Sequence, residues 1–236
     1  MADRKQLPTL PTSIFDLLAL AQSKPGRISY PKPPDFTGTT FLKQVLMEVS
    51  KDRSALYKPM TAQAFASLSP ALWAYLDALH PHLWRKGKQF PASPAAVRQM
   101  MSDGELLLAM TVNPNEAANE IAAKRLADTV VSYQHSVGTI GNTHFLAIPF
   151  NAKAKEGAQV AANFLLSPEA QARKADIAIW GDPTVLALDK LSATQKASFA
   201  AKPMPGQLTH TAPTIAEPHG TWVEPLEKEW IRRYGV

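Results

Sequence analysis

One segment decides the fold class: Gly104-Glu-Leu-Leu-Leu-Ala-Met-Thr-Val-Asn-Pro-Asn-Glu116. Residues 106–112 form a short apolar run between turn residues, which is typical of a buried strand. Asn113-Pro114-Asn115 then marks a turn, and a helix is expected to begin at Glu116. Because a strand followed by a turn and a helix is the unit from which α/β proteins are built, this segment predicts an α/β fold.

The rest of the chain continues this alternation. Small polar residues before apolar helical patterns mark helix starts, as in Ser93-Pro94, where proline takes the first helical position. Helices are expected over 13–24, 35–49, 69–84, 93–103, 154–166 and 223–234, with further helix starts at 116 and 167. Two more strands are expected over 129–133 and 143–149, and another turn is expected at Asp182-Pro183.

Composition narrows the class of protein. The 236 residues carry 25 Lys and Arg against 20 Asp and Glu, which gives a net charge of +5. The basic side chains are scattered, with the densest groups at Arg85–Lys86 and Arg232–Arg233, whereas a nucleic-acid site gathers them on one face. We therefore expect no nucleic acid among the partners. The length corresponds to one large domain or two small ones.

Motifs for catalysis or for metal binding are not found. Cysteine is absent, which removes thiolate ligands and cysteine nucleophiles. The six histidines, His80-Pro-His82 included, lack the spacing of zinc sites. Neither a Gly-x-Ser-x-Gly motif nor a phosphate-binding loop occurs. We expect a protein that is not an enzyme and that has no catalytic residues, no metal and no cofactor.

Two turns at helix starts point instead to ligand binding. Asp35-Phe-Thr-Gly-Thr-Thr40 and Asn113-Pro-Asn115 combine free backbone N–H groups with hydroxyls or amides, which suit an oxygen-rich or anionic ligand. The same residues also serve as ordinary N-caps, so both interpretations stay open. We expect the two turns to face one cleft, walled by nearby aromatic side chains. The predicted ligand-binding residues are Phe36, Thr37, Gly38, Thr39, Asn113, Asn115, Tyr133, Asn142 and Trp180.

Four stretches carry a resemblance to a known family. They are Pro25-Gly-Arg-Ile-Ser-Tyr-Pro-Lys-Pro-Pro-Asp-Phe-Thr-Gly38, Gly104-Glu-Leu-Leu-Leu-Ala-Met-Thr-Val-Asn-Pro114, Phe145-Leu-Ala-Ile-Pro-Phe-Asn-Ala152 and Ala161-Ala-Asn-Phe-Leu-Leu-Ser-Pro-Glu-Ala-Gln171. With them the chain resembles the extracellular solute-binding proteins of ABC importers. Three motifs resemble a subgroup described as thiamine-binding-protein-like: Trp180-Gly-Asp-Pro-Thr184, Glu217-Pro-His219 and Trp230-x-x-Arg-Tyr-Gly235.

The resemblance implies a periplasmic-binding-protein-like (type II) fold, in which two α/β lobes close on a small solute. It makes residues 8–137 the second lobe and residues 138–236 the crossover with the returning first-lobe and C-terminal segment. The opening part of the first lobe is then missing from this chain. The two glycines of Gly138-Thr-Ile-Gly141 fit a hinge over Gly138–Asn142.

The resemblance also implies partners and a location. The partners are a small-molecule solute and the permease subunits of an ABC importer at the membrane. The full-length protein is expected in the periplasm, although the first residues here lack the apolar core of a signal peptide. Because an incomplete lobe exposes apolar surface, we also expect a homodimer, and we expect this chain alone to bind the solute poorly.

Two other functions stay open at this stage. One is an enzyme on the same two-lobed fold, and the other is a one-lobe sensor or interaction domain. The solute is also open among a thiamine-like cation, a polyamine, an oxyanion and a metal chelate.

Overall fold

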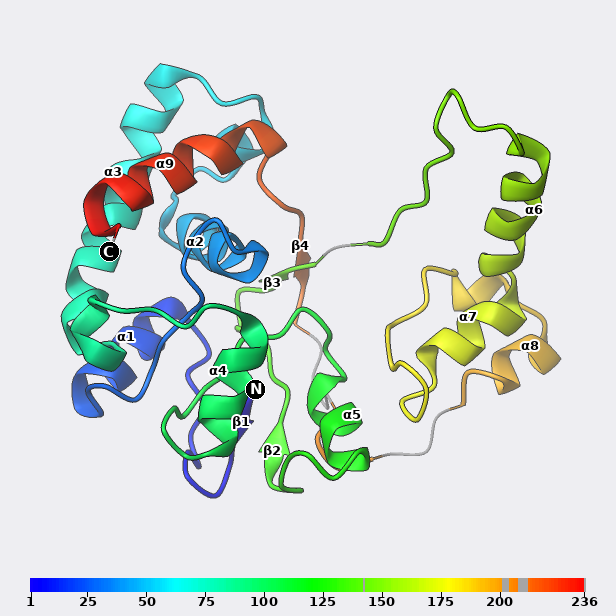
Figure 1. The fold of residues 1–236 in the computed structure, drawn as a ribbon, viewed down its shortest axis with the longest axis horizontal. Coiled ribbons are helices and arrows are strands. Elements are labelled where there is room, and N and C mark those ends of the chain that lie inside the picture. Colours follow the sequence, from blue (N-terminus) through cyan, green and yellow to red (C-terminus); the bar gives the residue numbers. More distant parts are fainter. Residues whose placement is uncertain (142, 201–203, 208–211, 236) are drawn as a thin grey trace.

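The computed structural model describes residues 1–141, 143–200, 204–207 and 212–235. Figure 1 shows two parts that differ in size. The larger part, called the body, contains residues 1–141 and 212–235. The smaller part, called the helical module, contains residues 143–200 and lies to one side of the body. Residues 143–149, which form no helix or strand, lead from the body toward the helical module.

Helix α2 (Phe36–Val49) lies at the centre of the body. Asp35 caps it, and 10 of its 14 residues are buried. A helix that is apolar on most sides must be covered on most sides. Helices α3 (Ala62–Leu79) and α9 (Val223–Tyr234) pack against it, and Trp222 and Trp230 at the C-terminal end of the chain complete this core.

The remaining helices are short, and most of them begin where a serine side chain caps the first turn. Ser13, Ser93 and Ser167 each accept a hydrogen bond from a backbone N–H in the first helical turn, as the sequence predicts. These helices are α1 (Ile14–Ser23), α4 (Pro94–Ser102), α5 (Glu116–Ala122), α6 (Lys155–Leu165), α7 (Pro168–Ala175) and α8 (Ala193–Ala197). Within the described residues, 3₁₀ turns span Ser54–Tyr57, His80–His82, Leu188–Lys190 and Gly220–Trp222, and a further turn over Trp84–Gly87 has positive φ at Arg85 and Lys86.

Strands are few and short in the described residues. Strand β1 (Ala2–Asp3) pairs antiparallel with β2 (Val130–Val131), and β3 (Thr139–Ile140) pairs parallel with β4 (Thr214–Ile215). The expected strand over 106–112 is wrong in most of its length, since only Leu108 forms a bridge, to Ala2. The expected strand over 143–149 is also wrong, because these residues form no strand and Phe145 is 85% exposed. The described part is therefore richer in helix than the predicted α/β fold.

Two expected local features also differ. The third helix begins at Ala62, capped by Thr61, and not at Ser69. Pro70 lies inside that helix, where burial of Leu72 and Leu76 offsets its missing N–H donor. Asp182-Pro183 forms no turn, and Asp182 instead pairs with Lys174 of α7 at 2.7 Å.

The chain leaves the body after β3, and it meets the body again before β4, where the carbonyl oxygen of Gly206 accepts from the backbone N of Ser132 at 3.3 Å (Figure 1). The predicted hinge over 138–142 lies at this exit, except for Asn142, which falls outside the described residues. Gly138 has φ +102°, and a Cβ there would approach the carbonyl oxygen of Pro213 to 2.4 Å. The division into units 8–137 and 138–236 stays a prediction, and α9 of the second unit packs on α2 of the body.

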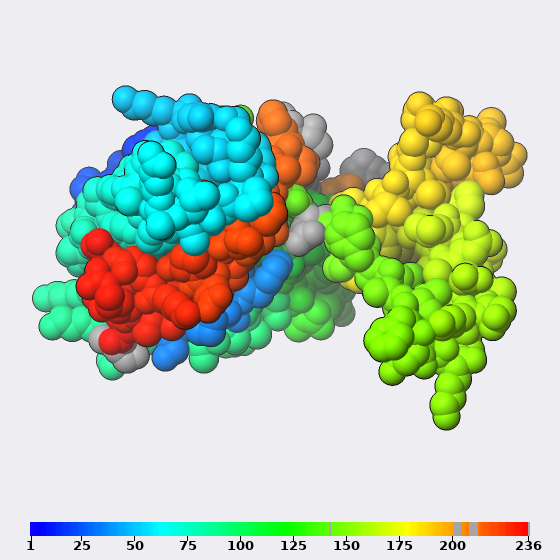
Figure 2. Space-filling view, turned by 90° about the horizontal axis from the view of Figure 1, so that it is seen from above, coloured from blue at the N-terminus to red at the C-terminus, as the bar shows by residue number. Residues whose placement is uncertain are grey.

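The helical module has little core of its own. Helix α6 contains no buried residue, although Val160 and Phe164 lie one turn apart on it. Figure 2 shows the module projecting from the body, joined to it over a narrow region. No described helix is long and apolar enough to cross a membrane.

Candidate functional site

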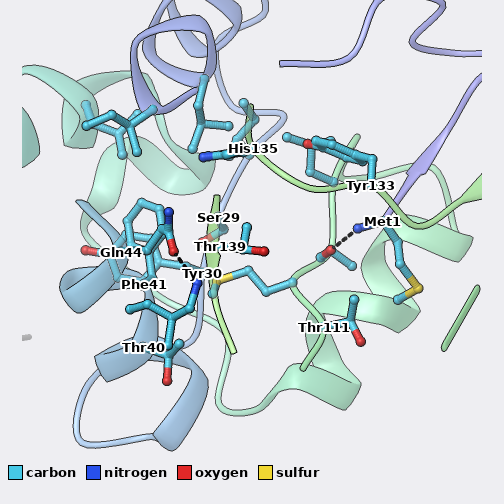
Figure 3. Close-up of a pocket in the computed structure, with 18 of the residues that line it drawn as sticks. Met1, Ser29, Tyr30, Thr40, Phe41, Gln44, Thr111, Tyr133, His135 and Thr139 are labelled. Carbon is cyan, nitrogen blue, oxygen red and sulfur yellow. Dashed lines mark hydrogen bonds between the residues drawn. The ribbon is translucent and has the colours of Figure 1, made fainter. Parts of the chain in front are cut away.

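A cavity of about 170 Å³ opens into the body between α2, the segment 108–111 and β3 (Figure 3). Its inner wall consists of buried residues from α1, α2, α3 and the loops next to them. Its rim consists of half-buried residues, several of them polar. The rim residues are Thr40, Met110, Thr111, Tyr133, His135, Thr139 and Ile140.

Gln44 holds the β3 edge of the cavity against α2. Its Nε2 donates to the carbonyl oxygen of Gly138 at 3.0 Å, and its Oε1 accepts from the backbone N of Ile140 at 2.9 Å. The nitrogen and the oxygen of this buried side-chain amide are therefore both hydrogen-bonded to the backbone around β3. This pairing fixes the place of Thr139 on the rim.

A half-buried hydrogen bond between His135 and Glu48 holds the turn that precedes β3. His135 Nδ1 lies 2.5 Å from Glu48 Oε1, and the other carboxylate oxygen accepts from the backbone N of Ile14 at 3.0 Å. Burial raises the pKa of Glu48, but the hydrogen bonds from His135, Gln44 and Ile14 outweigh burial and keep that pKa below its ordinary value.

An aromatic network supports the inner wall. Trp230 Nε1 donates to the Tyr30 hydroxyl at 2.9 Å, and that hydroxyl lies 2.7 Å from His80 Nε2. Burial lowers the pKa of His80 to about 4, and Asp77 offsets this only in part. The ring is therefore neutral at pH 7, and its Nε2 accepts a hydrogen bond from the Tyr30 hydroxyl. This network fixes the wall without placing a charge in it.

The turn after Thr111 joins the cavity rim to the helical module. The Thr111 hydroxyl accepts from the backbone N of Asn113 at 3.0 Å. Asn115 Nδ2 donates to the carbonyl oxygen of Gly181 at 2.7 Å, and Asn113 Nδ2 lies 3.4 Å from the carbonyl oxygen of Trp180. We call this contact, formed by Asn113, Asn115, Trp180 and Gly181, the junction.

The Trp180 side chain is half exposed at the junction and has charged and aromatic neighbours. His144 lies 5.6 Å from it between ring centroids, and Lys174 Nζ lies 5.7 Å from its centroid. Asp182 pairs with Lys174 at 2.7 Å. An aromatic face beside fixed amides and an ion pair can hold a solute with both a flat and a polar part.

Comparison with known proteins identifies the family. Residues 2–203 match the family described as bacterial extracellular solute-binding protein. The chain belongs to this family. The family resemblance found in the sequence is thereby confirmed at this level.

One relative of this solute-binding protein is Protein YnjB of Escherichia coli (strain K12). The two are 47% identical over 236 residues, which is 100% of this chain and 60% of the relative. The chain thus spans about three fifths of the length of that relative. No solved structure matches the chain.

The predicted ligand-binding residues of this solute-binding protein fall in three places. Tyr133 lines the cavity, and Asn113, Asn115 and Trp180 meet at the junction. The third place is the start of α2, which contains Phe36, Thr37, Gly38 and Thr39. Asn142 lies outside the described residues.

The start of α2 uses its polar groups within the protein. Asp35 Oδ1 accepts from the backbone N of Thr37 at 2.9 Å and of Gly38 at 3.2 Å. The Thr39 hydroxyl donates to Glu227 at 2.6 Å, and Phe36 is exposed above Lys43. These contacts are those of a capped helix packed on α9, which is the second interpretation that the sequence left open.

Several cavity residues were missed by the sequence reasoning. Thr40 belongs to the quoted turn 35–40, yet it was not among the predicted residues, and Thr111 belongs to the expected strand. The local sequence around Gln44 and His135 does not indicate that they line a cavity, because a polar side chain on a helix or in a loop is usually solvated. Among the described residues, no group of three or more His, Asp and Glu is placed to hold a metal ion.

Proposed function

We propose that this protein binds a small solute in the cavity and at the adjoining junction, and delivers it to the permease of an ABC importer. One observation carries the proposal: Thr40, Thr111 and Thr139 come from three distant segments and line one cavity with an apolar inner wall. Ligand sites of soluble proteins combine apolar walls with a few convergent polar groups in this way.

The arrangement of the two parts supports a role in solute capture. The cavity lies in the body, whereas Trp180 belongs to the helical module, and at the junction the side chains of Asn113 and Asn115 hydrogen-bond to the backbone oxygens of Trp180 and Gly181. A solute that contacts both the body and the helical module would favour an arrangement in which the two parts lie close together. It gains contacts in that closed arrangement that it lacks when the two parts lie apart. Movement about the β3 and β4 connections would permit opening, and Gly138 has the conformational freedom for it.

We extend the proposal to the finer features that the family suggests. The fold is of the type II periplasmic-binding class, the subgroup is the thiamine-binding-protein-like one, and the place of action is the periplasm. The role is binding and transport without catalysis. The Trp180-Gly-Asp-Pro-Thr184 motif supports this subgroup, because it resembles the subgroup in sequence and lies at the junction.

We also propose that this 236-residue chain self-associates. Val160 is 70% exposed and Phe164 is 57% exposed on α6, and the extended segment before α6 exposes Phe145 as well. Apolar surface of this kind is costly in water, and a second copy presents the same surface in self-complementary form. The homodimer would bury the α6 faces of the two copies against each other.

The proposed function is tested by finding the solute and then weakening its site. Native mass spectrometry of gently purified protein should reveal a bound small molecule, which is then titrated by calorimetry. Tyr133→Phe removes a hydroxyl from the rim and should weaken binding about five-fold. Tyr57→Phe removes a hydroxyl from an exposed residue that does not line the cavity and should leave the affinity unchanged. Equal affinities for all three proteins would contradict the proposed site.

A further inference from the structure

The inner wall of the cavity is apolar and tightly defined. Six buried side chains from four segments contribute to it. They are Ile14, Leu17, Ile28, Phe41, Leu79 and Leu83. A wall of this kind favours the apolar part of a ligand. It disfavours a hydrated ion, because the apolar side chains offer no hydrogen bonds to replace the water that the ion would lose.

One polar atom in this wall has no partner. Ser29 is 5% exposed, and its Oγ forms no hydrogen bond with any described residue. Ser29 lines the cavity, as Thr139 of β3 does. Buried hydroxyls are nearly always hydrogen-bonded, because leaving one unpaired costs free energy. Because this Oγ is itself closed off from solvent, Ser29 presents it to a ligand atom in the cavity only after a rotation about its Cα–Cβ bond.

The titratable groups around the cavity bring no free charge to it. Burial raises the pKa of Tyr30 and of Tyr133, so both are neutral at pH 7. Burial lowers the pKa of the Met1 amino group to about 5, and this group donates to the carbonyl oxygen of Ala109 at 2.6 Å. His135 is paired with Glu48. Neither an anion nor a cation would find an opposite charge at the inner wall.

The size of the cavity sets the size of the group. Its volume is about 170 Å³. An apolar cavity of about 150 Å³ engineered in another protein binds benzene. One six-membered ring therefore fits, whereas a two-ring system would extend past the rim toward Thr111.

We infer that the cavity receives an uncharged six-membered ring of the solute and that one polar atom of this ring hydrogen-bonds to Ser29 Oγ. The inference rests on the proposed function, since it takes the cavity to be the solute site. The charged or strongly polar remainder of the solute lies outside the rim, toward Trp180 and the junction amides. Among the solute classes left open by the sequence, polyamines, simple oxyanions and metal chelates lack the required ring.

Small ring compounds test the inference without knowledge of the natural solute. Phenol and benzene are titrated into the 236-residue protein while the amide signals of Thr111 and Thr139 are followed by NMR. Both compounds should shift these signals, and phenol should bind more tightly than benzene. Ser29→Ala should weaken phenol about five-fold and leave benzene unchanged, because only phenol has a group to pair with Ser29. Sulfate and spermidine should cause no saturable shift at these positions.

A blocking variant gives a second measure. Ala109 lines the cavity and is 4% exposed, so Ala109→Met places a longer side chain in the space that the ring needs. It should abolish saturable binding of both rings, whereas Ala158→Met on the surface of α6 should not.

The outcomes separate the two proposals. Absence of saturable phenol binding to the wild type, or equal weakening of phenol and benzene by Ser29→Ala, would overturn the ring inference. Binding of the purified natural solute at the rim without a ring in the cavity would overturn it while leaving the proposed function intact. A third outcome is that phenol and benzene bind in the cavity as expected while the natural solute binds elsewhere. That result would show that the cavity binds a ring, and it would overturn the proposed function.

Discussion

His135 donates a hydrogen bond from Nδ1 to Oε1 of Glu48 across 2.5 Å, although 87 residues separate the two in the sequence. Glu48 lies near the end of α2, and His135 lies in the turn that leads to β3. The contact therefore fixes the point at which the chain leaves the body. Together with Gln44, it holds one edge of the cavity against the central helix.

Glu48→Gln should destabilise the protein by about 1–3 kcal/mol at pH 7, because it keeps the shape of the side chain but removes the charge that His135 pairs with. The folded-state pKa of Glu48 is lowered from 4.5, so its contribution is present above pH 4.5 and is lost as the pH falls through the folded-state pKa. Urea unfolding at pH 7 and below pH 4 should therefore show a difference that shrinks in acid. Glu156→Gln, on an exposed part of α6, is the control and should change stability little.

His80 should make stability depend on pH in a different range. Its pKa falls from 6.5 to about 4 on burial in the folded state, so the unfolded chain binds a proton in this range that the folded chain does not. Stability should fall by about 2 kcal/mol between pH 7 and pH 5. His80→Gln keeps an acceptor for the Tyr30 hydroxyl and should remove most of that fall in urea unfolding. A variant as pH-sensitive as the wild type over this range would show that another group is responsible.

Gly38→Ala should destabilise the start of α2 by about 1–3 kcal/mol. A Cβ on Gly38 would approach the carbonyl oxygen of Pro31 to 2.0 Å, and the backbone there must shift to admit it. Gly157, on exposed α6, has no atom within 4 Å of the same position. Gly157→Ala should leave stability equal or raise it by about 0.5–1 kcal/mol, since alanine suits a helix better than glycine. Thermal unfolding of the pair tests whether close packing explains this glycine.

Self-association should depend on the apolar face of α6. Light scattering of the 236-residue chain is expected to give a mass near twice the 25.7 kDa of one chain. Replacing Val160 and Phe164 together by lysine should restore the monomer mass. The matched control replaces Gln159 and Asn163 by lysine, which adds the same charge beside that face. A monomer at all protein concentrations would contradict the proposed homodimer.

Most helix starts were predictable from the sequence because their signals are local, whereas α3 begins at Ala62 and not at the predicted Ser69. The caps at Ser13, Asp35, Ser93 and Ser167 each need only a side-chain oxygen and the N–H groups two or three residues later. The strands were not predictable in the same way. Apolar runs at 106–112 and 143–149 have the composition of strands, but a strand also needs a hydrogen-bonding neighbour, and few residues in the described chain provide one.

The cavity was predictable only in part, for the same physical reason. Tyr133 could be selected as an aromatic residue near a predicted turn, and the Asn113–Asn115 turn was found from its helix start. Gln44 and Glu48 have roles that depend on β3 and His135, about 90 residues away in the sequence. Such roles follow from tertiary packing, which a pattern within one helix does not encode.

The position of the bound solute tests the central claim most directly. A crystal structure of the protein with the solute that co-purifies with it should show solute atoms within hydrogen-bond distance of Thr111, Tyr133 or Thr139, with the Trp180 ring beside the part that leaves the cavity. A solute bound elsewhere, with the cavity of about 170 Å³ unfilled, would contradict the assignment of this cavity as the solute site.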